Sequence, residues 1–523
     1  MSWIVIGEEN GKIKLVSKKP SGKEKPGMLP KGSFLTVEAG DSKNKYILRV
    51  DESNQFEPYK PSPLVIDMDL SGLYQDTKCQ NIIYAYRVMD TENRTDGKVD
   101  FISPQLIARR STQKEVELAL SSGEKGPKIF LATVHSGKNQ LLQDDDGHYI
   151  TTNLPEDMFF HQMLVCGKTG SGKTVAMKYL MQYFVEEMKG AVLAINVKDV
   201  DLLRMDQASN LKDPGIQNEW KNLEYKPRGV ENFIIYYPAN TVFPKNLGIS
   251  QEKTERITLK VKEIDPDSLT GLLQNISEVG SQALPDIFRY WKEKNENKEV
   301  TFQDFVNHFR ACIEDRTFPA MNIRGDVTEI MLQKNTIVNV ERNLTFAIEF
   351  FDNKDAKSLQ AENILFPGKL SVINVTGEKE IQFGSILLRD LLKKIVEAKR
   401  KEKFYTPILV IIDEVHQFYS NENAEEALGA LDTICRTGRS SRIGVIFASQ
   451  NQEDIPKGLS NVINTKIFFR SDSVKNMHLG ISADEFQSLS AGYAVVNVHN
   501  LPHLRIIKFP VSLAGVFENE RNN

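Results

Sequence analysis

The sequence lacks several features that mark particular classes of protein. Its 523 residues include only four cysteines, and none of them has the CxxC spacing of a zinc or redox site. A reducing, cytoplasmic setting is therefore expected. No stretch approaches the roughly 18 consecutive apolar residues of a membrane helix, and the first residues carry no basic leader. We expect neither membrane insertion nor secretion.

An excess of positive charge is also missing. The chain has 66 lysines and arginines against 70 aspartates and glutamates, which gives a formal net charge of −4. The overall charge thus offers no argument for nucleic-acid binding, and any contact with DNA would need local basic clusters. With 40% hydrophobic residues, a chain of this length can bury a large core and form two to four structural units.

The first segment, residues 1–110, has the pattern of a small antiparallel β-barrel. Short apolar runs alternate with turn-forming Gly, Pro, Asn and Asp, as in residues 12–16, 33–37 and 46–50. A helical stretch near residues 112–121 follows the barrel.

The segment 111–205 has a different pattern. An apolar strand at residues 163–166 leads through a glycine-rich loop into an amphipathic helix at 174–189, and a second buried strand follows at 191–195. Strand, helix and strand form a βαβ unit, which requires a parallel sheet. This segment is predicted to be the first part of an α/β core.

Residues 206–364 are predicted to be a mostly helical insertion in that core, with helical candidates at 267–277, 302–313 and 326–340. The second part of the core is predicted at 365–510, followed by a C-terminal tail at 511–523. The expected elements of this second part are strands at 370–375, 408–412, 443–448 and 465–469, and a helix at about 381–401.

The loop after the first core strand matches the phosphate-binding pattern GxxxxGK[ST] in full. Its residues are Gly167, Lys168, Thr169, Gly170, Ser171, Gly172, Lys173 and Thr174. Glycines allow backbone N–H groups to converge on phosphate oxygens at a helix N-terminus, where the partial positive charge favours anions. Lys173 is expected to reach the β- and γ-phosphates of ATP, and the Thr174 hydroxyl to ligate Mg²⁺.

A pair of carboxylates ends the strand at residues 408–412. Open α/β sheets bind their ligands at the carboxyl ends of the strands, so Asp413 is expected to hold Mg²⁺ through water and Glu414 to polarise the attacking water. An acid pair that caps a helix is the alternative interpretation.

A third group of candidates surrounds the strand at residues 443–448. Arg436 and Arg439 precede the strand and Gln450 follows it. The arginines could stabilise charge that develops on the γ-phosphate. Alternatively, they belong to a solvated basic turn, and Gln450 is an ordinary polar residue at a strand end.

Taken in order, these motifs resemble the HerA/FtsK family of hexameric DNA translocases, HerA in particular, over about residues 145–515. The resemblance implies a RecA-like P-loop NTPase core with a mainly parallel sheet and a small N-terminal barrel that helps to assemble a ring, expected to be a hexamer. It also implies that Arg439, with Arg436 beside it, acts in trans on the ATP of a neighbouring subunit, and that Gln450 is a sensor.

The function implied by this resemblance is an ATP-driven translocase or helicase on double-stranded DNA. Such motors work with a separately encoded effector, either a nuclease or a sirtuin-like NAD hydrolase, in DNA end processing or anti-phage defence. Lys198, Arg204 and Lys212 are candidates for DNA contact in the ring pore. Two alternatives stay open: a regulatory ATPase ring that scaffolds and activates its effector, and a conjugation or secretion ATPase.

The chain departs from the family pattern at two positions. Relatives carry an arginine just before the phosphate-loop strand, where this chain has Phe159, Phe160 and His161. They also carry an acidic residue after the next strand, where this chain has Asn196. Asp199 is a candidate to replace that acid.

Overall fold

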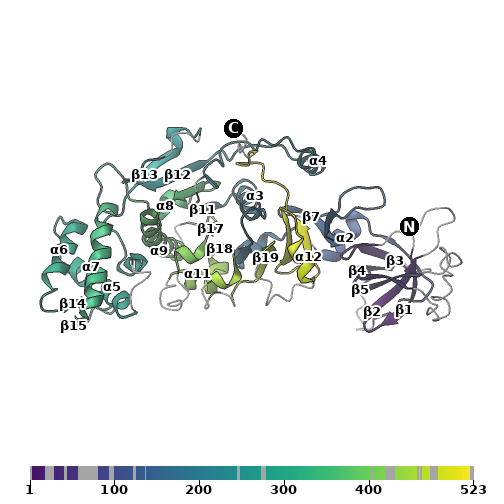
Figure 1. Cartoon of the computed structure of the whole chain (residues 1–523), viewed down its shortest axis with the longest axis horizontal. Helices are drawn as coiled ribbons and strands as arrows, with labels where there is room; N and C mark the ends of the chain where they lie inside the picture. The colour runs from purple at the N-terminus through teal and green to yellow at the C-terminus, as the bar shows by residue number, and fades with distance from the viewer. Residues whose placement is uncertain are drawn as a thin grey trace, which may run out of the picture. The chain divides into compact units, whose positions relative to one another are not determined.

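The chain forms two compact units. Unit 1 comprises residues 1–156 and 468–510, and unit 2 comprises residues 157–467 and 511–523. The predicted segments 111–205 and 365–510 thus each contribute to both units. The computed structural model (Figure 1) describes the chain apart from residues 1–2, 18–28, 40–43, 57–79, 93–98, 122–124, 136, 199, 244–247, 273–277, 402–403, 420–429, 456–458, 460–461, 472–480 and 519–523.

The N-terminal part of unit 1 is the predicted β-barrel. The barrel is closed, with the strand order β1-β2-β5-β4-β3-β6, and alternate residues such as Val5, Leu15, Leu35 and Leu48 fill its interior. The strands are β1 (Trp3–Glu9), β2 (Lys12–Ser17), β3 (Phe34–Glu38), β4 (Lys45–Phe56), β5 (Gln80–Asp90) and β6 (Ile107–Arg110).

A charged cap fixes the helix that follows the barrel, α2 (Gln113–Leu120). The Glu115 carboxylate accepts hydrogen bonds from the Thr112 backbone N–H at 2.9 Å, from Arg109 at 2.8 Å and from Lys45 at 3.2 Å. Burial alone would raise the pKa of Glu115, but these donors outweigh burial and hold the pKa well below its usual range. The cap therefore joins the helix to the barrel through one ionised side chain.

The rest of unit 1 is a small, mainly antiparallel sheet. Strands β20, β21 and β7 pair in that order, and β8 and β9 both pair with β7. The elements are β7 (Lys128–His135), β8 (Lys138–Leu141), β9 (Thr151–Asn153), α12 (Ala483–Gln487), β20 (Tyr493–Asn497) and β21 (Ile506–Lys508).

Unit 2 contains the predicted parallel sheet, which confirms the α/β core. The strand order is β13-β12-β16-β11-β17-β18-β10, and each neighbouring pair is parallel. The strands are β10 (Met163–Cys166), β11 (Ala191–Asn196), β12 (Phe233–Pro238), β13 (Thr254–Ile257), β16 (Leu370–Asn374), β17 (Ile408–Ile412) and β18 (Ile443–Ser449), with β19 (Thr465–Phe469) next in the order.

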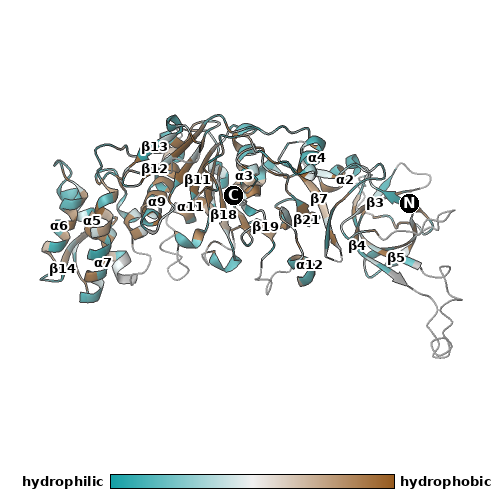
Figure 2. Ribbon diagram, turned by 45° about the horizontal axis from the view of Figure 1, so that its top comes forward, coloured by the Kyte–Doolittle hydropathy of each residue, from teal (hydrophilic) through white to brown (hydrophobic). Residues whose placement is uncertain are grey.

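Helices cover both faces of this sheet. Helix α3 (Lys173–Glu186) connects β10 to β11, whereas α9 (Glu378–Arg400) and α11 (Ala430–Ser441) connect strands in the opposite direction along the sheet. Because such crossovers are right-handed, α3 lies on one face and α9 and α11 on the other (Figure 1). Figure 2 shows the hydrophobic strands β11 and β18 between these helices.

The segment predicted to be a helical insertion contains helices, but β12 and β13 within it join the core sheet. Its helices are α4 (Pro214–Asn222), η4 (Gln251–Lys253), η5 (Pro266–Leu272), α5 (Glu278–Lys294), α6 (Phe302–Ala311), α7 (Lys334–Ala347), η6 (Ile348–Phe350) and α8 (Ala361–Ile364). Of the helix predicted at 267–277, the described part is a 3₁₀ helix, and residues 273–277 lie outside the described chain.

The helix predicted at 326–340 is wrong in its first half. Residues Thr317–Met321 and Val327–Met331 form an antiparallel hairpin, β14 and β15, before α7 begins at Lys334. Gly325 adopts a φ of 90° in the turn, and the strand after it contains β-branched residues, which favour extended backbone. The turn and the β-branched run outweigh the helical preference of the following residues.

The described part of the predicted C-terminal tail, residues 511–518, packs into unit 2. The Trp220 Nε1–H donates to the Val511 carbonyl at 2.8 Å, and the buried Lys178 Nζ on α3 donates to the Gly515 carbonyl at 2.6 Å. Burial lowers the pKa of Lys178 to about 8. This segment therefore holds the helix that follows the glycine loop.

Long helices are few among the described residues. The 23-residue α9 is one of them, and it carries charged residues along its length. Within the part of the chain that the structure describes, no helix combines the length and the apolar character needed to cross a membrane.

Glu115→Gln is expected to destabilise unit 1 at neutral pH by about 1–3 kcal/mol, because a charged acceptor of several hydrogen bonds is lost. Because the pKa of Glu115 is lowered in the folded protein, this contribution is complete above the ordinary carboxyl pKa. It is lost progressively as the pH falls from that value toward the lower pKa of the folded state. Scanning calorimetry should therefore show a difference between variant and wild type at pH 7 that shrinks below about pH 4. Glu117→Gln, an exposed position on the same helix, is the control. An equal effect of both substitutions would contradict the assignment.

Candidate active site

The glycine loop connects β10 to α3 at the carboxyl edge of the parallel sheet. β10 ends at Cys166 and α3 begins at Lys173. Gly170 and Gly172 have φ values of 77° and 99°, a left-handed conformation that residues with a Cβ rarely adopt. The glycines therefore permit the turn that directs backbone N–H groups toward an anion at the start of α3.

Two polar side chains of this loop are buried without a hydrogen-bond partner among the described residues. They are the Lys173 ammonium and the Ser171 hydroxyl, and Lys173 is only 4% exposed. Buried polar groups are almost always hydrogen-bonded, so unpaired donors of this kind indicate a ligand that completes them. A polyphosphate provides the matching acceptors and negative charge.

Asp413 and Glu414 follow β17 at the same edge of the sheet and are both 2% exposed. The Glu414 backbone N–H donates to Asp413 Oδ1 at 3.0 Å. Glu414 has a φ of 48°, which is uncommon for a residue other than glycine. Strain of this kind is concentrated at functional sites, where the surrounding structure maintains it.

The two neighbouring carboxylates have opposite pKa shifts. Burial raises the pKa of Asp413 although Lys198 and Lys173 oppose the shift. Burial acts in the same direction on Glu414, but a hydrogen bond from Lys198 and the charge of Lys173 outweigh it and lower the pKa. The site therefore contains one ionised carboxylate and one whose charge lacks compensation, which a divalent cation would stabilise.

The Thr174 hydroxyl lies beside an acid that the sequence motifs did not indicate. Its Oγ1 donates to Asp201 Oδ2 at 3.5 Å, and the charge of Asp201 contributes to the raised pKa of Asp413. Hydroxyl and carboxylate oxygens are the ligands that Mg²⁺ takes. Thr174 and Asp413 could therefore hold Mg²⁺ with Asp201 nearby. In the sequence, Asp201 is distinguished only as an acidic residue shortly after the core strand β11.

Gln450 lies at the same edge of the sheet, directly after β18. Its Nε2 is 3.4 Å from Glu414 Oε1. Ser449, the last residue of β18, donates a hydrogen bond to Asp454. The structure thus brings Lys173, Glu414 and Gln450 together at one edge of the sheet.

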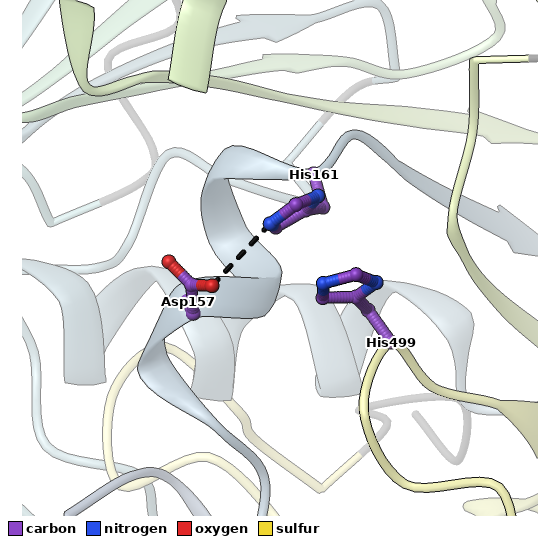
Figure 3. A group of neighbouring side chains, drawn as sticks. All are labelled: Asp157, His161 and His499. Carbon is purple, nitrogen blue, oxygen red and sulfur yellow. Dashed lines mark ion pairs between the residues drawn. The ribbon is translucent and has the colours of Figure 1, made fainter. Parts of the chain in front are cut away.

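The two candidate arginines lie elsewhere, near the C-terminus of α11 and before β18 begins. Arg439 is 68% exposed and its Nη2 is 3.8 Å from Asp157 Oδ2. The same Asp157 oxygen lies 3.3 Å from His161 Nε2 (Figure 3). Arg436 is 61% exposed and is paired with Asp432 at 2.8 Å. Among the described residues, neither arginine forms a hydrogen bond or ion pair with the glycine loop of its own chain.

The end of α11 that carries Arg436 and Arg439 depends on Gly438. A Cβ on Gly438 would lie 2.5 Å from the Ile443 carbonyl and 3.3 Å from the Gln162 amide. Gln162 in turn accepts a hydrogen bond from the Val445 N–H at 2.8 Å. This close approach fixes α11 against the start of β18 and sets the position of Arg439.

Comparison with known proteins finds similarity to HerA helicases. The model "Helicase HerA, central domain" matches residues 140–395. Over these residues the chain is similar to HerA-type P-loop ATPases. The DNA double-strand break repair helicase HerA of Sulfurisphaera tokodaii is 27% identical over 242 residues, which are 43% of this chain and 48% of that protein. The protein of the same name from Pyrococcus furiosus is 20% identical over 393 residues, 66% of this chain and 64% of that protein.

Each of these matches spans less than two thirds of the HerA relative's own length. Among solved structures, the bacterial conjugative coupling protein TrwBdeltaN70 is 13% identical, with a TM-score of 0.49 and coverage of 79% of this chain and 95% of that one. A likeness at that level carries no argument about function.

The structure gives a role to Asn196, which stands where the HerA-type pattern has an acid. Its side-chain N–H groups donate to Asn374 Oδ1 at 2.7 Å and to the Lys198 carbonyl at 2.5 Å, and its oxygen accepts from the Leu202 N–H at 3.2 Å. An ionised carboxylate has no N–H to donate. The amide thus organises the loop after β11. Asp199 lies outside the described residues.

The second departure from the HerA-type pattern is aromatic. Phe160 is buried, its ring packs on Phe184 at 6.1 Å between centroids, and the Arg442 guanidinium lies 5.4 Å from its centroid. The position therefore contributes packing between the start of β10 and α3.

Glu414→Gln is expected to retain ATP binding while hydrolysis falls by about 10²–10⁴, the usual contribution of a general base. Lys173→Ala is expected to lose ATP binding, because it removes the buried cation that faces the phosphates. Fluorescent-nucleotide titration and phosphate release measure the two effects separately. Glu397→Gln, exposed on α9, is the control. A Glu414→Gln variant as active as the wild type would exclude Glu414 as the base.

Proposed function

We propose that this chain hydrolyses ATP with Mg²⁺ at sites shared between the subunits of a ring, expected to be a hexamer, and uses the energy to move along double-stranded DNA. One observation carries the proposal. The glycine loop and Arg439 lie at opposite ends of the strands of the same parallel sheet. The loop follows the carboxyl end of β10, whereas Arg439 precedes the amino end of β18.

The distance between these edges follows from strand geometry. A strand rises about 3.3 Å per residue, so the seven residues of β18 span roughly 20 Å. An arginine side chain cannot cross that length. Arg439 is therefore available to the nucleotide of another copy and not to its own, and closed symmetry makes each copy both donor and acceptor.

The chain's own residues divide the chemistry among them. Lys173 and the loop backbone bind the phosphates, and Thr174 and Asp413 hold Mg²⁺, which offsets phosphate charge. Glu414 accepts a proton from the water whose oxygen attacks the γ-phosphorus, while the bond from that phosphorus to the bridging oxygen of ADP breaks. Gln450 contacts Glu414 and orients it, and Arg439 of a neighbour, with Arg436 beside it, stabilises the charge that develops.

The DNA substrate is supported by the relatives, which are named DNA double-strand break repair helicases. With a net charge of −4, DNA contact requires local cations. Of the three candidates, Lys198 pairs with Glu414 and the Arg204 guanidinium lies 5.2 Å from the centroid of the Phe517 ring, whereas Lys212 is exposed. We propose Lys212 as the pore contact.

The proposal includes a separately encoded effector, a nuclease or a sirtuin-like NAD hydrolase, in cytoplasmic DNA end processing or anti-phage defence. The closed barrel is the proposed docking module, on the basis of the family resemblance. Its outward side chains include Ile6 and Ile107, which are 46% and 51% exposed.

The purified wild type is expected to form a ring by mass measurement in solution and to hydrolyse ATP faster with duplex DNA. Lys173→Ala alone should abolish ATP turnover, and Arg439→Ala alone should lower the turnover rate by about 10³. When the two variants are mixed as subunits, partial activity should return, because some interfaces combine an intact glycine loop with an intact Arg439.

Arg310→Ala, which removes an exposed arginine paired with Glu341, is the matched control. A monomer with full ATPase activity that Arg439→Ala does not change would exclude the shared site. Nucleotide-dependent assembly without stimulation by DNA would instead indicate a regulatory scaffold, and a preference for single-stranded DNA or protein a conjugation or secretion ATPase.

A further inference from the structure

We propose that Lys198 is a positioning residue that inhibits hydrolysis by holding the Glu414 carboxylate in an ion pair until DNA is bound. The inference rests on the proposed function, because it concerns the same reaction. It adds a regulatory contact that the phosphate-loop and carboxylate motifs do not contain. Lys198 is therefore assigned to Glu414 rather than to DNA.

The contacts of one oxygen atom carry the argument. Glu414 Oε1 lies 2.8 Å from Lys198 Nζ, 3.4 Å from Gln450 Nε2 and 3.7 Å from Lys173 Nζ. Lys198 Nζ also lies 3.7 Å from Asp413 Oδ2. The Lys198 contact is the shortest of those to Oε1, and it is a charge-assisted hydrogen bond, which is the strongest class.

This ion pair opposes the function of Glu414. A general base must take a proton in the transition state, and a carboxylate that accepts a hydrogen bond from an ammonium group is a weaker base. The ion pair also lowers the basicity of the second oxygen, Oε2, because the negative charge is shared by both oxygens of the carboxylate.

The loop that carries Lys198 is fixed at its backbone. Asn196 donates to the Lys198 carbonyl at 2.5 Å and accepts from the Leu202 N–H at 3.2 Å. Asn196 thus fixes both sides of the loop. Asn196, which stands where the family pattern has an acid, therefore holds the backbone from which Lys198 reaches Glu414.

The exposure of the pair indicates how it is released. The Lys198 side chain is 34% exposed, whereas the Glu414 side chain is 3% exposed. Lys198 therefore approaches the carboxylate from the solvent side and can leave without disturbing the core. The segment after β11 leads from Lys198 to Lys212, the proposed DNA contact. DNA bound at Lys212 would therefore contact the same segment that carries Lys198.

The test compares Lys198→Met, which removes the charge at similar size, with Lys198→Arg, which keeps it. Lys198→Met is expected to raise the DNA-free ATPase rate about tenfold and to reduce the stimulation by DNA correspondingly, because a freed carboxylate is a stronger base. ATP affinity, measured with a fluorescent analogue, should change less than about threefold. Lys198→Arg should resemble the wild type. Lys379→Met, which removes an exposed ion pair with Glu349, is the control.

A second readout needs no turnover. In the nucleotide-free protein, the shifts in unfolding temperature of Lys198→Met and Glu414→Gln should be non-additive in the double variant, because each substitution removes the same ion pair. An unchanged DNA-free rate, additive shifts, or a joint fall of rate and ATP affinity would overturn the proposal, the last by making Lys198 a phosphate ligand. A wild type without ATPase activity would instead refute the proposed function.

Discussion

Across neighbouring parallel strands, Cys166 pairs with Ser449 and Ile412 pairs with Phe447. Because β10, β18 and β17 end at similar heights, the glycine loop, Gln450 and the two carboxylates leave the sheet at one edge. The nucleotide site is a consequence of this register. No single loop builds the site, and a change in the order or direction of these strands would separate its members.

The same register accounts for the position of the arginines. Every parallel strand starts at the side of the sheet opposite the glycine loop, and the end of α11 places Arg439 close to the start of β18. Gly438 and Gln162 hold that junction closely. In the proposed ring, a single subunit would therefore carry one half of a site at each end of its strands. The arrangement is complete only when the two kinds of edge meet, which is the physical basis of the proposed ring.

The charge balance at the ligand edge is the second constraint. Lys173 and Lys198 face Asp413 and Glu414 in a largely buried space. Lys173 retains a buried ammonium without a hydrogen-bond partner among the described residues, whereas Lys198 is already bound to Glu414. The two lysines thus differ: the Lys173 ammonium is available to a phosphate, whereas Lys198 is paired with Glu414, the proposed catalytic carboxylate.

Much of the fold could be predicted because its signals are local. The barrel strands alternate in hydropathy, and the core strands are apolar runs followed by glycine or acidic residues. Strand β12 and the hairpin before α7 were missed, because their pairing depends on distant partners. Within the site, loop residues with fixed motif spacing were found. Asp201 and the contact made by Lys198 were not, because no spacing rule relates a loop after β11 to a carboxylate more than two hundred residues later.

The central claim is that each nucleotide site is shared between two copies of the chain. A structure of the assembled protein with a non-hydrolysable ATP analogue and Mg²⁺ tests it most directly. The account predicts that the Arg439 guanidinium of one copy lies about 3 Å from the γ-phosphate bound by Lys173 of the next copy. If Arg439 stays beside its own Asp157 in every copy, and only residues of the same chain contact the γ-phosphate, the account is contradicted.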